Sequence, residues 1–213
     1  MAVYDLEEQE QLDELKAYWK QYGNLILTVL TLVFATVAAF QAWNFHQRRQ
    51  AAEASAMYAN LQRAQSAKDA KQVKEVAGTI LEKYPTTFYA SMAALVAAKS
   101  AYESGDVKTA KAQLGWVTEH AKPEEFADIA RLRLASLLLD EKDHDGALKL
   151  LEAKGNAAYA ARYADLKGDV LVAQGKAGDA KIAYRAALTA ISQKETALRD
   201  YVQQKLDSLG GAT

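Results

Sequence analysis

The side chains best suited to chemistry in this sequence are three histidines, His46, His120 and His144. Histidine is a frequent general base and metal ligand. None of the three has a second histidine, or a carboxylate at ligand spacing, in a convincing arrangement. His144 lies in the turn EKDHDG, which lacks the alternating oxygen ligands and the twelfth-position glutamate of an EF-hand calcium loop. The sequence therefore predicts no metal site.

Nucleophiles and cofactor loops are absent as well. The chain contains no cysteine, which excludes thiol nucleophiles, disulfides and cysteine zinc sites. No G-x-S-x-G, G-x-x-x-x-G-K or G-x-G-x-x-G motif occurs. Glu124 and Glu125 are typical of the charged first turn of a helix, where the helix dipole favours them. We predict that the protein is not an enzyme and holds no cofactor. Catalysis remains an alternative that no motif supports.

Composition favours packed helices as the elements that position the remaining residues. Of 213 residues, 50% are apolar, only 2 are proline and 11 are glycine, and alanine is abundant throughout. The formal net charge is -1 and no cluster of four Lys or Arg residues occurs. Nucleic-acid binders usually carry a basic patch, so we predict no nucleic-acid partner.

Residues 23–43 predict a membrane-spanning helix. No charged residue lies between Lys20 and Arg48, and a helix over 23–43 is about 30 Å long, the thickness of the hydrocarbon core. Aromatic and basic side chains at the two ends are expected to hold the span at the lipid–water boundary. These anchor residues are Trp19, Tyr22, Trp43, Arg48 and Arg49.

Two other interpretations of this segment are weaker. A cleaved signal peptide should begin with a short basic region, whereas residues 1–22 are acidic, and no small-x-small site closes the apolar run before Trp43. A buried core helix would need a larger chain to surround it. Orientation stays open, because Lys16 and Lys20 on one side balance the two arginines after the span.

The region after residue 50 predicts a tetratricopeptide-like repeat. Ala77, Ala110, Ala147 and Ala180 follow one another at intervals of 33, 37 and 33 residues, close to the 34-residue period of that repeat. We predict an all-α fold: one N-terminal transmembrane helix, then an α-solenoid of about four helix pairs with a cap helix over 193–208. An alanine-rich bundle without superhelical order is the alternative.

The last repeat is the clearest. Gly168 stands where close helix packing needs no side chain, and Gly175 forms the turn, whereas Lys142 stands at the corresponding turn of the weaker third repeat. The predicted packing positions are Gly105, Ala110, Ala147, Gly168, Gly175, Ala180, Tyr184 and Ala187.

The predicted concave surface has no catalytic pattern. Its candidate residues are Leu95, Lys99, Leu132, Ser136, Asp165 and Asp169. They lack the paired Lys and Asn with which some tetratricopeptide domains hold a C-terminal carboxylate, and Asp165 and Asp169 would repel such a ligand. If the groove binds peptide, we expect apolar or basic ligands.

The junctions on either side of the span carry a family resemblance. LKAYWKQYGN at 15–24 and AWNFHQRR at 42–49, with an acidic tail before them and a degenerate repeat after them, resemble the YfgM-type family of Gram-negative bacteria, the ancillary SecYEG translocon subunits. The resemblance covers essentially the whole chain and departs most at the third repeat.

The resemblance implies an inner-membrane protein that assists the SecYEG translocon and the periplasmic chaperone PpiD with secretory clients, and it implies no catalytic residues. Membrane lipid is the remaining expected partner. The expected organisation is a cytoplasmic acidic tail 1–22, the span 23–43, a juxtamembrane helix 44–65, a periplasmic repeat domain 66–208 and a tail 209–213. The alternatives are an envelope adaptor outside secretion and a membrane regulator whose acidic tail controls a signalling protein.

Overall fold

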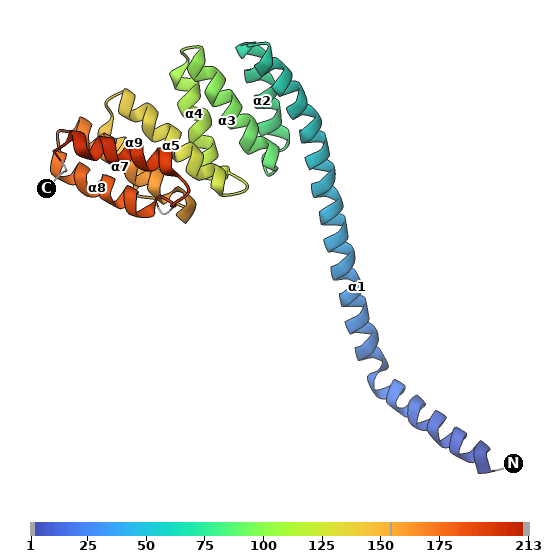
Figure 1. Ribbon diagram of the computed structural model, residues 1–213. Coiled ribbons are helices and arrows are strands. Elements are labelled where there is room, and N and C mark those ends of the chain that lie inside the picture. The colour runs from blue at the N-terminus through green and yellow to red at the C-terminus, as the bar shows by residue number, and fades with distance from the viewer. Residues whose placement is uncertain (1–2, 154, 211–213) are drawn as a thin grey trace. The chain divides into compact units, whose positions relative to one another are not determined.

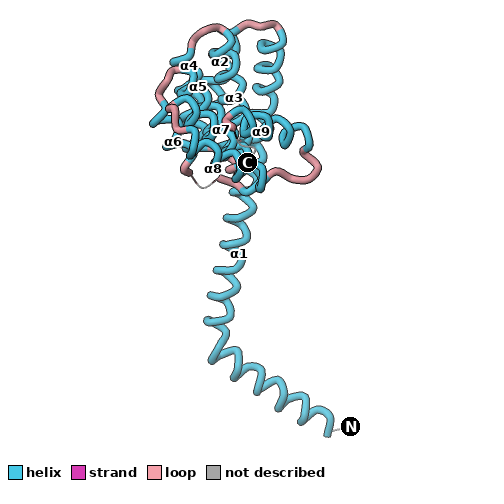
Figure 2. Tube along the Cα trace, turned by 60° about the vertical axis from the view of Figure 1, so that its left-hand side comes forward, coloured by secondary structure: helices cyan, strands magenta, loops and turns pink. Residues whose placement is uncertain are grey.

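A computed structural model describes residues 3–153 and 155–210, with side chains from residue 10 onward. Within that part of the chain the protein is helical and contains no strand, and the helices from α2 onward are joined by short loops (Figure 2). The helices are α1 (Val3–Ser66), α2 (Ala70–Lys83), α3 (Phe88–Glu103), α4 (Val107–His120), α5 (Glu125–Asp140), α6 (His144–Leu151), η1 (Ala157–Tyr159), α7 (Ala160–Ala173), α8 (Ala177–Ala190) and α9 (Thr196–Ser208). Two compact units divide the chain, residues 1–49 and 50–213.

The same tight turn recurs four times in the second unit. Two residues after the end of the first helix of each pair, the chain adopts the left-handed region. These residues are Lys68 (φ 55°), Gly105 (83°), Lys142 (65°) and Gly175 (74°). The next backbone N–H then donates back to a carbonyl of the first helix, as in a Schellman turn. Asp69, Asp106 and Asp143 follow three of these turns and cap the second helix through their carboxylates. The turn is therefore the structural unit that repeats.

The helices from α2 to α9 follow one another along the repeat domain (Figure 1). Four core clusters lie along this stack of helix pairs. Each cluster is shared by three consecutive helices: the end of α1 with α2 and α3, then α3–α5, α5–α7 and α7–α9. No pair buries its apolar side alone, so neighbours must stack. The predicted fold class, a tetratricopeptide-like solenoid of about four pairs with a cap helix, is confirmed.

The start of the repeat domain differs from the expected residue 66. Tyr58, Leu61 and Ala64, on the last turns of α1, are buried in the first core cluster. These turns are the first helix of the first pair, because α2 alone would leave that cluster open. A juxtamembrane helix over 44–65 therefore overlaps the packed unit, which begins at Gln50.

Six of the eight predicted packing positions are buried in the repeat domain, whereas Gly105 and Gly175 lie in turns, where a Cβ would meet no atom within 4 Å. The alanines Ala110, Ala147, Ala180 and Ala187 are each 0% exposed. A Cβ on Gly168 would lie 2.3 Å from the Tyr184 ring, which is closer than atoms can approach, so α7 and α8 pack together only because residue 168 has no side chain. Tyr184 is itself 3% exposed.

The first unit is the N-terminal part of α1. This is the one helix among the described residues that is long and apolar enough to cross a membrane, and its apolar window is not buried by the protein. Thr28, Thr31 and Thr36 donate their hydroxyls to the carbonyls of Asn24, Leu27 and Leu32 at 2.7–2.8 Å. The threonines thus satisfy their polar groups on the helix itself, which suits an apolar surrounding.

Aromatic rings flank this segment as the sequence predicts. The ring of Trp19 packs over the position of Gly23, and the rings of Tyr18 and Tyr22 lie 4.9 Å apart. Trp19, Tyr22 and Trp43 are 53%, 40% and 63% exposed, and Arg48 and Arg49 follow on the same helix. These side chains are available to an interfacial environment.

Candidate functional site

The first helices of successive pairs form one layer of the repeat domain. α5 lies against both α3 and α7. We call the exposed side of α3, α5 and α7 the inner face and the exposed side of α4, α6 and α8 the outer face. The candidate surface residues of the sequence analysis all lie on the three helices of the inner face.

Two of those candidates are packed rather than open. Leu95 is 8% exposed and belongs to the core cluster between α3 and α4. Leu132 is partly buried and packs against the cluster of α5–α7. Both residues therefore support the inner face and offer little surface to a ligand.

Lys99 and Ser136 line a hollow of about 420 Å³ between α3 and α5. Its floor is apolar and is formed by Ala98, Leu114 and Leu137. The Ser136 hydroxyl is occupied, because it donates to the carbonyl of Leu132 at 3.0 Å.

Three further residues of this hollow were missed in the sequence analysis: Tyr102, Arg133 and Asp140. Each lies three or four positions from Lys99 or Ser136, so continuing the helical spacing along α3 and α5 would have identified them. Tyr102 is 50% exposed. The hollow therefore presents an aromatic ring and charges of both signs above an apolar floor. This arrangement suits the binding of a peptide side chain better than it suits catalysis.

The two aspartates at the end of the inner face are not free. The ammonium group of Lys205, on α9, lies 2.8 Å from a carboxylate oxygen of Asp165 and 2.8 Å from one of Asp169. The Tyr184 hydroxyl donates to the other oxygen of Asp169 at 2.8 Å, and the ammonium lies 4.4 Å from the centre of the Tyr201 ring. We call this group the Lys205 clamp.

In the clamp, Lys205 balances one of the two negative charges of Asp165 and Asp169 and ties the cap helix to α7. The expectation that the two aspartates repel a carboxylate ligand stays a prediction. Burial raises the pKa of Asp165 although Lys205 acts against this rise. Burial alone would lower the pKa of Lys205, but the hydrogen bonds and charges of the two aspartates outweigh it and raise that pKa. The group is thus a structural lock for α9.

A second buried polar group centres on Asp128, which is 3% exposed. Its carboxylate accepts from the Tyr163 hydroxyl at 2.9 Å, from the backbone N–H of Asn156 at 3.0 Å and from Arg131 at 3.3 Å. A Cβ on Gly155 would lie 2.5 Å from it. We call this group the Asp128 hub. It holds the chain after α6 against α5 and α7, and burial together with the hydrogen bond to Asp128 raises the pKa of Tyr163 to about 12.

No cluster of metal-ligating side chains occurs among the residues that the structure describes. The three histidines are far apart in the sequence, and the ring of His120 stacks on Trp116 while its Nδ1 lies 2.9 Å from the Trp116 carbonyl. The inner-face hollow is thus an open surface between helices, and its geometry favours binding.

Comparison with known proteins adds the family. Residues 16–211 match the tetratricopeptide repeat-like domain family. A protein of Neisseria gonorrhoeae named ancillary SecYEG translocon subunit is 31% identical, covering 98% of this chain and 100% of its own length. Proteins of the same name from Haemophilus influenzae and Escherichia coli are 30% and 27% identical, over 97% and 98% of this chain and 100% and 99% of their own lengths.

Proposed function

The chain belongs to the tetratricopeptide repeat-like domain family and to the family of ancillary SecYEG translocon subunits, and from this membership we propose that it is a membrane-anchored, protein-binding subunit of that translocon. The observation that carries the proposal is the extent of the similarity. It covers the candidate span and the repeat domain together, so it concerns the combination of anchor and scaffold and not the repeat alone.

Finer features of the proposal come from the resemblance. Residues 1–22 lie in the cytoplasm, residues 23–43 cross the inner membrane, and the repeat domain, packed from Gln50 to about residue 208, lies in the periplasm. Its partners are the translocon, the chaperone PpiD, emerging secretory clients and the membrane lipid around the span. Anchor residues at both ends of the span support this arrangement, because amphipathic rings prefer the headgroup level.

The inner-face hollow is the part of the domain that we assign to clients. Tethering beside the exit of a channel gives a weak binding surface a high effective concentration of its ligand. An apolar floor with one exposed tyrosine and charges of both signs accepts many unfolded segments at modest affinity. This combination suits a subunit that meets many different clients only briefly.

Site-specific crosslinking in native membranes tests the proposal. A photo-crosslinking residue replaces Tyr102 in the hollow, and a matched control replaces Tyr201 on the cap helix, which is 55% exposed. We expect crosslinks from position 102 to secretory proteins during export, and fewer from position 201. Translocon or PpiD peptides should appear from the intact chain at either position. Absence of all of them from both positions would reject the assignment.

Protease protection of spheroplasts tests the sidedness separately. Added protease should digest the repeat domain and leave the segment before the span intact. The reverse pattern would reject the periplasmic location even if translocon crosslinks were found.

A further inference from the structure

The outer face has a gap because one of its helices is short. α2, α4 and α8 have 14 residues each, whereas α6 has eight and ends at Leu151. At 1.5 Å of rise per residue the shortfall is about 9 Å of helix. The side of α7 and α8 that a full-length α6 would cover is therefore left without a helical neighbour.

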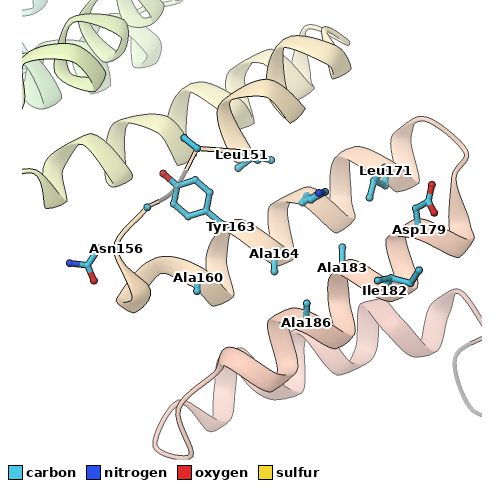
Figure 3. A pocket seen from close by; sticks show the side chains of 13 residues that line it. Leu151, Asn156, Ala160, Tyr163, Ala164, Leu171, Asp179, Ile182, Ala183 and Ala186 are labelled. Atoms are coloured by element: carbon cyan, nitrogen blue, oxygen red, sulfur yellow. The ribbon is translucent and has the colours of Figure 1, made fainter.

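A groove of about 640 Å³ occupies this place (Figure 3). Its walls are one face of α7 and one face of α8, and one end is lined by Leu151, Ala153, Gly155 and Asn156, at and after the end of α6. Alanines line both walls, together with Leu171 and Ile182: Ala160 and Ala164 on α7, and Ala183 and Ala186 on α8. Ile182 is 66% exposed. Small residues on both walls allow another helix to approach closely, and Ile182 is the large apolar side chain that such a helix would cover.

The groove also contains a cation without a partner. Lys167 lies on the same face of α7, between Ala164 and Leu171, and is partly buried. Among the described residues it makes no ion pair or side-chain hydrogen bond, unlike Lys205 on α9. The groove's own carboxylate, Asp179, is exposed in the first turn of α8, where the helix dipole already favours it. A bound partner with a carboxylate at this place would form an ion pair with Lys167 and neutralise its charge.

We propose that this groove binds a short amphipathic helix of a partner protein, two to three turns long, with its apolar face on Ile182 and an Asp or Glu opposite Lys167. Such a helix would complete the outer layer where α6 stops, by the helix-in-groove mode of recognition. The groove shares no lining residue with the inner-face hollow between α3 and α5, so a client in that hollow and this partner can be bound together. The inference stands on the groove alone and does not rest on the translocon assignment.

A lipid surface fits the groove less well. Recognition of anionic lipid usually needs a cluster of four or more basic side chains, and the described residues that line the groove include one lysine and one aspartate. A single unpaired cation in an apolar groove instead matches a single acidic side chain on an otherwise apolar helix.

Two stapled twelve-residue helices serve as probes. Both carry leucine and alanine on one face; the acidic probe has two glutamates at the edge of that face, and the basic probe has lysines there. Binding is measured by fluorescence anisotropy to the full chain in phosphatidylcholine nanodiscs, with empty nanodiscs as the blank. We expect the acidic probe to bind at least tenfold more tightly than the basic one.

Three variants test whether the probes bind in the groove. Lys167→Glu should reverse the preference in favour of the basic probe, and Ile182→Glu should weaken both probes at least tenfold. Val172→Glu is the matched control: Val172 is 39% exposed on α7 but lies outside the groove, and this variant should bind as the natural chain does. Circular dichroism confirms that each variant is folded.

Four results would overturn the proposal. They are equal binding of the two probes, absence of binding by either probe, equal loss of binding in Val172→Glu and Ile182→Glu, and displacement of the acidic probe by phosphatidylglycerol vesicles. A concentration-dependent dimer that Ile182→Glu abolishes would also overturn it, because the occupant would then be a second copy of the chain.

Discussion

The third and fourth helix pairs make the same contact with different residues. Gly168 of α7 faces Tyr184 of α8. The residues 33 positions earlier are Ala135 of α5 and Leu151 of α6, and both are buried in one core cluster. A larger residue on the first helix is matched by a smaller residue on the second. Interiors conserve total volume across a contact, so a degenerate repeat keeps its fold by such compensation.

The two pairs differ more in how they end. The fourth pair continues through a full α8 and is closed by the Lys205 clamp. The third ends early at Leu151, and the Asp128 hub holds the chain that follows it. A shortened helix thus requires a buried polar anchor nearby, because the loop after it cannot be positioned by apolar packing alone.

Removing the Asp128 hub should have the largest effect on the free energy of unfolding. It tests most directly how the third helix pair differs from the fourth. Asp128→Ala leaves the buried Tyr163 hydroxyl and the partly buried Asn156 N–H without their acceptor, and we expect the free energy of unfolding to fall by about 3 kcal/mol. Urea unfolding of the full chain in detergent, followed by near-ultraviolet circular dichroism, measures it. Asp140→Ala, an exposed change at the end of the same helix, is the control; an equal loss there would contradict the role of the hub.

Alkaline pH should weaken the third pair through Tyr163. Its folded pKa of about 12 exceeds the unfolded value of 10.0, so its contribution is complete below pH 10 and is lost as pH rises toward 12. This loss amounts to at most about 2.7 kcal/mol. Tyr163→Phe should flatten the fall of stability over that range, whatever its stability at neutral pH. An unchanged slope in the variant would reject this origin.

Gly168→Ala tests the compensation itself. The added Cβ would meet the Tyr184 ring at 2.3 Å, and overpacking should lower the free energy of unfolding by about 2 kcal/mol, beyond the gain in helix propensity. The double variant Gly168→Ala with Tyr184→Leu copies the third pair and should lose less than the sum of the two single variants. Additive losses would show that the two positions do not compensate each other.

The smallest expected effect has the opposite sign. Lys142 adopts φ 65° at the turn of the third pair, where the fourth pair has Gly175. Lys142→Gly relieves the left-handed strain and should raise the free energy of unfolding by about 0.5–1 kcal/mol. Gly175→Ala should lower it by a similar amount. A loss of stability in Lys142→Gly would mean that the two turns are not equivalent.

The sequence predicts what depends on local periodicity. Apolar length indicates the candidate span, alanine spacing indicates the repeat, and the family resemblance at the junctions is confirmed by relatives that match over nearly the whole chain. Gly105 and Gly175 mark their turns because the left-handed region favours glycine.

Long-range polar contacts could not be predicted in the same way. Lys205 lies 40 residues after Asp165, and the Asp128 hub joins side chains 35 residues apart. Nothing near Asp128 in the sequence distinguishes it from the exposed acids of the same first turn. The early end of α6 is equally hidden, because its apolar spacing does not change before Leu151.

The cap helix also limits how many modules the array can contain. Val202 and Leu206 face inward, while Asp200, Gln203, Gln204 and Asp207 are exposed on α9. Apart from the ring of Tyr201, this exterior is polar and offers little apolar surface on which another module could stack. Lengthening of the array, by evolution or by an engineer, must therefore occur upstream of α9, where an inserted pair would meet compatible apolar neighbours on both sides.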